Sequence, residues 1–446
     1  MSLIDLDIQD VISKAIVNDD RSIKVIIRNS LEDFEIDDKF LVFLEIDRDY
    51  MRNKTDFMRL CFQYPAGSMM KDFYAHRNNL EVILTYRNVL YNEENKPEVK
   101  DLVRTYKAII INSDGGSMNP EYMKADPQIL DKGNMSIITL QLVDRIYEVL
   151  RPIPLELNRR HASMTDVLGT HMKTVITEKE VLIEDEQVDL TIDVVEAHNN
   201  VELDNVRYEQ KDGEDVVRVM RLGNYLQEEY GVYNSGIGCY LQHYRGRDIL
   251  FYYPLADITR FNKEKDKLII LIPVKDGEGM IDSNYVRDGD VLKIIVDPNI
   301  KDYNPGDKPL RESGAAVAGV DPNHILSGNM VDNVVATPIA GLEDGSAPTV
   351  FVGSEGNLYK HRSNIILNNL IVFNFTWRHG NPDEIFPGMP VKVIQEQPYD
   401  EITGETKPYL REYNGSVVTT FTAFNCRTRS ITTNISVMVG RPRKLL

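Results

Sequence analysis

The sequence has little of what a disulfide-stabilised or membrane-spanning protein needs. Its 446 residues include three cysteines, Cys61, Cys239 and Cys426, and none belongs to a C-x-x-C pair. Such a sparse and odd number indicates reduced thiols. No run approaches the roughly 20 apolar residues of a membrane helix, and the first residues lack the basic region and apolar stretch of a signal peptide. We therefore expect folding in a cytoplasm and no membrane insertion.

Positive charge is also scarce. Lys and Arg number 51 against 69 Asp and Glu, so the net charge is −18. Nucleic-acid binding is driven largely by Lys and Arg that release counterions from phosphates, which excludes a broad basic face for nucleic acid. The chain is 42% hydrophobic and 27% charged, a globular balance that excludes wholesale disorder. Its length predicts about three domains.

Recognisable catalytic and ligand-binding motifs are missing as well. The eight histidines form no H-x-x-x-H pair and none lies two or three residues from a cysteine, as metal ligands would. Ser68 and Lys71 match the S-x-x-K of serine acyl transferases, but the partner signatures are missing. A glycosidase needs two carboxylates at a defined separation in space. With 69 Asp and Glu residues in the chain, the sequence alone cannot identify such a pair. We predict no enzyme, and no catalytic, cofactor-binding or metal-binding residue.

What the sequence does have is alternation of apolar and polar residues, the pattern of strands with one buried face. Between Phe57 and Tyr64, Met58, Leu60 and Phe62 share one face. The pattern predicts about six strands before Pro152, which close into a barrel or pack as a sandwich. They are Ile23–Arg28, Phe40–Ile46, Phe57–Tyr64, Val82–Tyr86, Tyr106–Ile111 and Ile138–Leu142.

After Pro154 the pattern becomes mixed. Apolar residues at helical spacing follow Ser163, and Asp166 completes a variant capping box, so Ser163–Met172 is predicted as a helix. His171 falls on its apolar stripe, where we expect a packed, hydrogen-bonded core histidine. A second helix is predicted through Leu222–Glu229, ending at Gly231. A hairpin of Ile237–Tyr244 and Ile249–Leu255 follows, then strands at Leu268–Val274 and Val291–Val296.

Aromatic residues crowd the predicted hairpin. Tyrosine supplies rigid, amphipathic contact area, so a ligand platform, strand-face packing and a protein interface are all open, and we favour the interface. The residues are Tyr230, Tyr233, Tyr240, Tyr244, Phe251, Tyr252 and Tyr253.

The last third of the chain first loses and then regains strand character. Asn304–Val350 has no aromatic residue and is rich in Gly, Ala, Asp, Asn and Pro. It is predicted as an extended loop, or as an arm that orders against a partner. Alternation returns at Ile371–Trp377 and continues through Val417–Phe421 to Val439. Asn414-Gly415 is predicted as a tight turn before the penultimate strand.

These patterns predict a mainly β protein with a smaller α+β middle: two β-barrel-like domains and a connecting mixed domain. The expected division is an N-terminal β-barrel-like domain, a mixed domain, a strand with an extended arm, and a C-terminal β domain. Their bounds are 1–155, 156–280, 281–360 and 361–446.

Several segments resemble the hub proteins of bacteriophage tail baseplates, which are related in fold to the N-terminal part of type VI secretion spike proteins. The segments follow the expected order and cover most of the chain, although each motif is short. We see no sequence similarity between the two β regions. The segments are Phe57–Tyr64 with Asp72–Arg77 and Leu80–Ile83, then Ser163–Met172, then Leu226–Tyr233 through Phe251–Leu255 to Phe261, and last Phe386–Val393.

The resemblance implies a structural, hub-like architecture without catalysis or cofactors. It implies a homotrimer in the virion tail baseplate, assembled in the host cytoplasm, which joins the six-fold tail tube to the three-fold central spike and forms part of the channel for genome passage. The implied partners are further copies of this chain, the tail tube protein, the central spike protein and other baseplate components, with the tape measure protein as a further candidate. Specific nucleic-acid binding is not expected. A trimer would carry a charge of −54, three times −18, and an acidic inner wall would repel DNA phosphates.

Two alternatives remain open from the sequence. Another tail or baseplate component, such as a wedge or adhesion protein, would share the β-rich character and the lack of motifs. A tail-associated cell-wall hydrolase is a more distant alternative, because it would need a carboxylate pair in a cleft.

Overall fold

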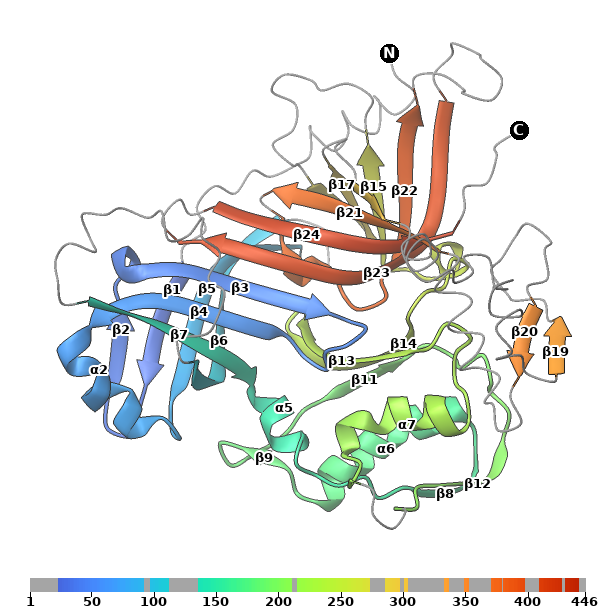
Figure 1. Cartoon of the computed structure of the whole chain (residues 1–446), viewed down its shortest axis with the longest axis horizontal. Helices are drawn as coiled ribbons and strands as arrows, with labels where there is room; N and C mark the ends of the chain where they lie inside the picture. The colour runs from blue at the N-terminus through green and yellow to red at the C-terminus, as the bar shows by residue number, and fades with distance from the viewer. Residues whose placement is uncertain are drawn as a thin grey trace, which may run out of the picture.

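A computed structural model shows a mainly β protein with a few short helices, in agreement with the predicted fold class (Figure 1). Among the described residues, no helix combines the length and apolar character needed to cross a membrane. The structure describes residues 23–91, 97–111, 135–210, 215–272, 285–296, 301–303, 333–336, 349–352, 370–378, 380–397, 409–426 and 430–440.

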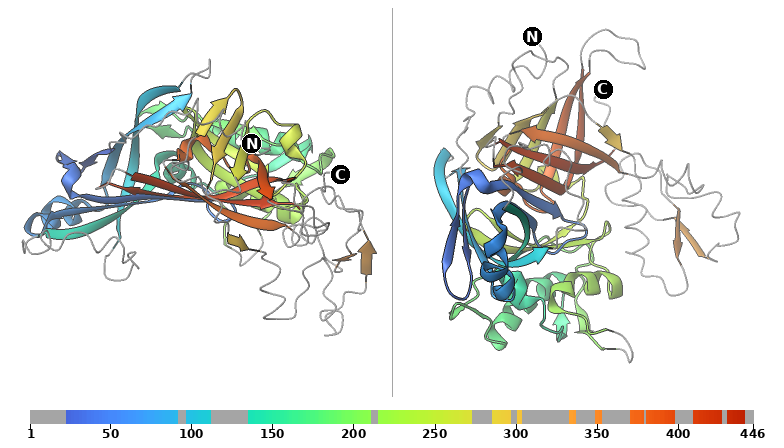
Figure 2. Two further views of the ribbon diagram at one scale, coloured as in Figure 1. Left: turned by 90° about the horizontal axis from the view of Figure 1, so that it is seen from above. Right: turned by 60° about the vertical axis from the view of Figure 1, so that its left-hand side comes forward.

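One large sheet of fifteen strands joins the two ends of the chain (Figures 1 and 2). β23 (Tyr409–Asn425) connects the halves, because it pairs with β3 (Leu41–Asp49) on one side and β22 (Pro390–Gln397) on the other. Beyond β3 the order is β4 (Phe57–Pro65), β7 (Met135–Asp144), β6 (Pro97–Ile111), β5 (Glu81–Tyr91), β1 (Ile23–Arg28) and β2 (Asp33–Ile36). Beyond β22 it is β15 (Lys267–Ile272), β17 (Val291–Ile295) and β16 (Tyr285–Asp288). β24 (Ser430–Val439) pairs with β23 and β21 (Ile371–Arg378), and β21 pairs with β18 (Lys301–Tyr303).

The N-terminal half of this sheet holds a core of its own. All six predicted strands form, since their alternating apolar residues point into one cluster that includes Val25, Leu60 and Leu140. Phe424 and Ile431, from β23 and β24, complete the cluster. Short helical segments cap the strands: η1 (Asp38–Phe40), α2 (Ala66–Asp72), η2 (Tyr74–His76) and α5 (Arg145–Leu150).

The middle of the chain is a separate layer. A three-stranded sheet has the order β11 (Thr191–Val194), β14 (Arg247–Pro254) and β13 (Ile237–Tyr244). Helices α6 (Met164–Glu178) and α7 (Leu222–Glu229) pack together beside it (Figure 1). The remaining elements are β8 (Asn158–Ala162), β9 (Leu182–Ile183), β10 (Glu186–Gln187), β12 (Leu203–Arg207), η3 (Val219–Arg221) and η4 (Arg260–Asn262).

Both predicted helices form, but α6 continues six residues past its predicted end at Met172, to Glu178. Ser163 accepts a hydrogen bond from the Asp166 backbone N–H, and the Asp166 carboxylate accepts one from the Ser163 backbone N–H. This reciprocal capping box fixes the start of α6. The second helix ends before Gly231, whose φ of 74° stops it.

The hairpin of β13 and β14 is buried on both faces, which corrects the interface prediction for its aromatic residues. Tyr240, Phe251 and Tyr253 point into the C-terminal core, whereas Cys239 and Tyr252 point into the core around the helices. Tyr233 is also fully buried, and only Tyr230 is half-buried at the surface. The aromatic residues therefore join two cores within one chain and offer no broad surface to a partner. Alternation finds strands with one buried face, whereas the uninterrupted apolar run Ile249–Tyr253 is typical of a strand that is buried on both faces.

The predicted turn at Asn414-Gly415 is wrong, because both residues lie inside β23. Gly415 pairs with Val391 on one side and with Val439 on the other. A Cβ atom at Gly415 would lie 1.9 Å from the Met438 carbonyl oxygen. The glycine is therefore required by the close approach of β24, just before the register shift between Val417 and Thr419.

Most of the predicted arm Asn304–Val350 lies outside the described residues. Within it the structure describes β19 (Asn333–Ala336), which pairs with β20 (Thr349–Val352). The proposed domain boundaries stay a prediction.

Candidate functional site

The S-x-x-K match is the one catalytic motif that the sequence offers. Ser68 and Lys71 lie on the short helix α2, and Lys71 is exposed at the surface. Within the described ranges, no three His, Cys, Asp or Glu side chains lie close enough to share a metal ion. The structure does bring one set of ionisable residues together in the interior.

A cluster of charged and phenolic side chains lies between the N-terminal core and the C-terminal core. We call Arg48, Asp56, Tyr86, Tyr240 and Asp383 the polar junction. Arg48 on β3 is 1% exposed and donates to both carboxylates, at 2.9 Å to Asp56 and 2.9 Å to Asp383. It also donates to the Pro382 carbonyl at 2.7 Å. The Arg48 guanidinium thus connects Asp56, in the turn after β3, to Pro382 and Asp383. These two residues are 334 and 335 positions away from Arg48 in the sequence.

Two tyrosines complete the polar junction. The Tyr86 hydroxyl donates to Asp383 at 2.7 Å, and the Tyr240 hydroxyl donates to Asp56 at 3.0 Å. Burial alone would raise the pKa of Asp383, but Arg48 and the Tyr86 hydrogen bond hold that pKa below its ordinary value. Burial would lower the pKa of Arg48, and the carboxylates Asp56 and Asp383 raise it well above the ordinary value. The junction therefore holds the Arg48 cation between the carboxyl groups of Asp56 and Asp383.

A second polar group extends the contact between the N-terminal sheet and the hairpin. Arg104 on β6 donates to Asp248 at 3.2 Å, and the Asp248 carboxylate also meets His243 Nδ1 at 2.8 Å. Burial would raise the pKa of Asp248, and the His243 hydrogen bond and Arg104 lower it overall. A charged pair thus holds the hairpin against β6, and the Tyr240 hydrogen bond to Asp56 holds it against the turn after β3.

The segment from Gly380 to Met389, with η5 (Pro382–Glu384), is buried throughout and inserts between the cores. Phe386 stacks on Phe251 with ring centroids 5.6 Å apart. Glu384, two residues earlier, forms an ion pair with Arg287 on β16, whose Nε donates to Glu384 Oε2 at 2.7 Å. The Gln242 side chain donates to the Ile385 carbonyl at 2.8 Å. This segment therefore makes the hairpin, the N-terminal sheet and the C-terminal sheet one body.

Sequence reasoning did not identify the polar junction. Asp383 and Glu384 stand directly before the apolar Ile385-Phe386, an unusual place for two acids if they were solvated. That position is a weak signal, and the partners Arg48 and Arg287 lie far away in the chain. Only the tertiary structure shows that Asp383 pairs with Arg48 and Glu384 with Arg287.

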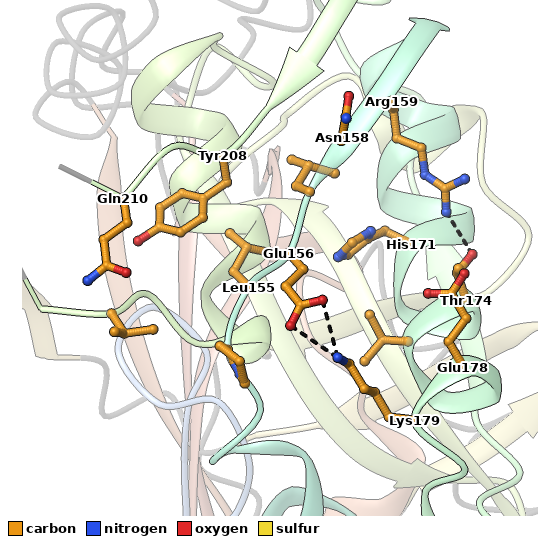
Figure 3. A pocket seen from close by; sticks show the side chains of 14 residues that line it. Leu155, Glu156, Asn158, Arg159, His171, Thr174, Glu178, Lys179, Tyr208 and Gln210 are labelled. Atoms are coloured by element: carbon orange, nitrogen blue, oxygen red, sulfur yellow. Dashed lines mark hydrogen bonds and ion pairs between the residues drawn. The ribbon is translucent and has the colours of Figure 1, made fainter.

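A groove opens on the helical layer, between α6 and the segment that leads into β8 (Figure 3). Its volume is about 570 Å³, within the range of small-ligand sites. Two polar bridges span its sides. Arg159 donates to the Thr174 hydroxyl at 2.7 Å, and Lys179 lies 3.0 Å from a Glu156 oxygen.

His171 lines this groove from α6 and is 3% exposed. It is buried on the apolar stripe, as the sequence predicts. Its Nε2 atom, however, has no hydrogen-bond partner among the described residues, so the expected hydrogen-bonded state is not seen for that nitrogen. Burial, with the charge of Arg159, lowers the pKa of His171 to about 4. The imidazole is therefore neutral at pH 7.

No protein-family model matches the sequence, and no curated protein sequence matches it. Among solved structures, the chain is similar to the tail protein from Neisseria meningitidis MC58, at 11% identity over 94% of this chain and 96% of that chain, with a TM-score of 0.42. It is similar to the 43 kDa tail protein of prophage MuSo2 from Shewanella oneidensis, at 9% identity over 93% and 97%, with a TM-score of 0.43.

A third solved structure is a half-lidded PdpA–VgrG complex from Francisella. The identity is 10% over 98% of this chain and 62% of that chain, with a TM-score of 0.37. Tail proteins and a VgrG complex are thus among the structures that this chain resembles.

Proposed function

We propose that this chain is a structural, non-enzymatic component of a phage tail baseplate. In this proposal it is a hub that assembles as a homotrimer, joins the six-fold tail tube to the three-fold central spike, and forms part of the channel for the genome. Its partners are copies of itself, the tube protein, the spike protein and other baseplate components.

The observation that carries the proposal is the assembly of the hub-like sequence segments around one buried hairpin. Phe386, from the last of these segments, packs on Phe251 and Tyr244 of the hairpin. Helix α6, from the second segment, packs on α7, which belongs to the third. The residues of the resemblance thus form the connection between cores. A rigid body of several cores suits an adaptor, which must hold fixed contacts on two sides.

The net charge of −18 supports the channel part of the proposal. An acidic wall repels phosphates, so DNA would pass without adhering. Mapping the electrostatic potential on an assembled trimer tests this point, and a basic lumen would contradict it.

The mass of the purified full chain in solution, by light scattering with negative-stain images of the same peak, tests the assembly. We expect a ring-like trimer of about 153 kDa, three times 51.0 kDa. If the chain alone is a monomer, the measurement is repeated with the tube protein and with the spike protein of the same tail. A chain that stays monomeric with both contradicts the hub. Binding to host cells or clearing of cell walls would favour an adhesin or a hydrolase instead.

A further inference from the structure

The groove between α6 and β8 contains an arginine without a counter-ion. Arg159 is half-buried and lines the groove. Its one hydrogen bond within the described part of the chain goes to the neutral Thr174 hydroxyl, and it makes no ion pair there. That hydroxyl in turn donates to the Thr170 carbonyl, at 3.1 Å. Four of the five N–H donors of a guanidinium are therefore left for a ligand.

A second polar group in the groove also lacks a partner. His171 is 3% exposed, and its Nε2 makes no hydrogen bond to any residue that the structure describes. Buried polar atoms are almost always paired with protein, water or a ligand. Figure 3 shows His171 directed away from α6 toward the segment of Leu155 and Glu156, across the groove. In the tautomer with the proton on Nε2, the neutral ring would donate one hydrogen bond.

The rest of the lining defines the other parts of a ligand. Leu155, Leu157 and Val175 are buried and give the groove an apolar floor. At the rim, Glu156 is neutralised by Lys179, at 3.0 and 3.2 Å. Glu178 is exposed and makes no ion pair within the described residues. Arg159 and Glu178 are thus the charged lining residues that make no ion pair within the described residues.

We propose that this groove binds the carboxylate of a ligand with an apolar body. Arg159 holds both carboxylate oxygens, His171 donates from Nε2, and the apolar body rests on Leu155, Leu157 and Val175. A guanidinium matches the geometry of a carboxylate with two parallel hydrogen bonds. The carboxylate belongs to a small molecule or to the C-terminus of a partner chain. The proposal does not depend on the hub or on trimer formation.

Saturation-transfer NMR on the full chain tests the proposal, because it detects weak ligands of large proteins. The probe is 4-methylpentanoate, and the matched neutral probe is 4-methylpentanamide. We expect the acid to bind at least about tenfold more tightly than the amide, a ratio worth 1.4 kcal/mol. Equal binding of the two probes, or binding of neither, would overturn the proposal. So would binding of inorganic phosphate in preference to the acid.

Three variants place the ligand in the groove. Arg159→Gln should weaken binding of the acid about tenfold or more, and Arg159→Lys should weaken it less, because the charge remains without the fork. Glu178→Gln, the matched control, should bind the acid at least as tightly as the wild type. Unchanged binding in Arg159→Gln, with a wild-type melting temperature, would contradict the site. If Arg159→Gln does not fold, Arg159→Lys serves the same comparison.

Two peptides distinguish the source of the carboxylate. One ends in a free leucine carboxylate and the other in leucine amide. Tighter binding of the free peptide than of 4-methylpentanoate supports the site and assigns it to a protein C-terminus. Tighter binding of the small acid supports the site and assigns it to a small molecule.

Discussion

At the scale of single residues, the molecule is defined by charges placed where water is excluded. Arg48 is 1% exposed, and its two carboxylate partners are nearly as buried. A buried ion pair adds little stability beyond apolar packing, but removal of one partner leaves a buried charge uncompensated. The polar junction is therefore sensitive to single substitutions and specifies how the cores meet.

Arg48→Met should lower the free energy of unfolding by about 3–5 kcal/mol, because Asp56 and Asp383 lose their cation. The urea midpoint at pH 7 measures the loss. Arg28→Met is the control, since the pair of Arg28 with Asp33 is about half exposed and such pairs contribute about 1 kcal/mol or less. Equal effects of the two substitutions would show that the junction is not buried in solution.

His171 should make stability depend on pH. Its pKa is about 4 in the folded chain, lowered from 6.5, so the unfolded chain binds the proton more readily. Above pH 6.5 the ring is neutral in both states and folding carries no penalty from it. As the pH falls from 6.5 toward 4, the free energy of unfolding decreases by up to about 3 kcal/mol. His171→Leu should remove that part of the slope between pH 6.5 and 4. Parallel pH profiles of the unfolding free energy for the two proteins would contradict it.

At the scale of elements, strands and helices are shaped by what lies on both of their faces. The β13–β14 hairpin contributes to two cores, and the segment Gly380–Met389 fits against it at close range. Gly388 has a φ of 61°, and a Cβ there would lie 2.1 Å from the Tyr253 ring. No other residue type satisfies both conditions without moving the ring.

Gly388→Ala should lower the free energy of unfolding by more than about 3 kcal/mol, because backbone strain and overpacking act together. Gly246→Ala provides the matched control. Gly246 has a φ of 79°, and nothing lies within 4 Å of its added Cβ, so only the left-handed backbone cost of about 1–2 kcal/mol remains. Urea unfolding of both variants checks the difference. A control as destabilising as Gly388→Ala would remove the steric argument.

At the scale of the whole molecule, the shared hairpin makes the cores depend on one another. The C-terminal core and the core around the helices use opposite faces of the same two strands, and β23 pairs directly with the N-terminal strand β3. Loss of one of these two cores therefore exposes one face of the strands on which the other core packs. We expect the chain to unfold as one unit, which is unusual for its length.

Two probes already in the chain test this cooperativity. Trp377 is the one tryptophan of the sequence and lies in the C-terminal core. Cys239 lies in the core around the helices. In a Cys61→Ser, Cys426→Ser variant, the urea midpoint of Trp377 fluorescence should equal that of Cys239 thiol labelling. Separate midpoints would show independently unfolding domains. Arg48→Met leaves the shared hairpin in place, so it should lower both midpoints together.

The sequence by itself determined the local structure. Alternating apolar residues predicted Ile23–Arg28 and Phe57–Tyr64 as strands, and Ser163 with Asp166 predicted the start of α6, because these signals act within a few residues. The tertiary structure decided the rest. Asn414-Gly415 has the chemistry of a turn but lies within a strand, since the approach of β24 overrides local preference. The polar junction depends on contacts between residues more than 300 positions apart, such as Arg48 and Asp383. The apolar run Ile249–Tyr253 favours burial of the hairpin on both faces, but which elements pack against each face depends on residues far away in the chain. A pattern confined to neighbouring residues carries no record of those partners.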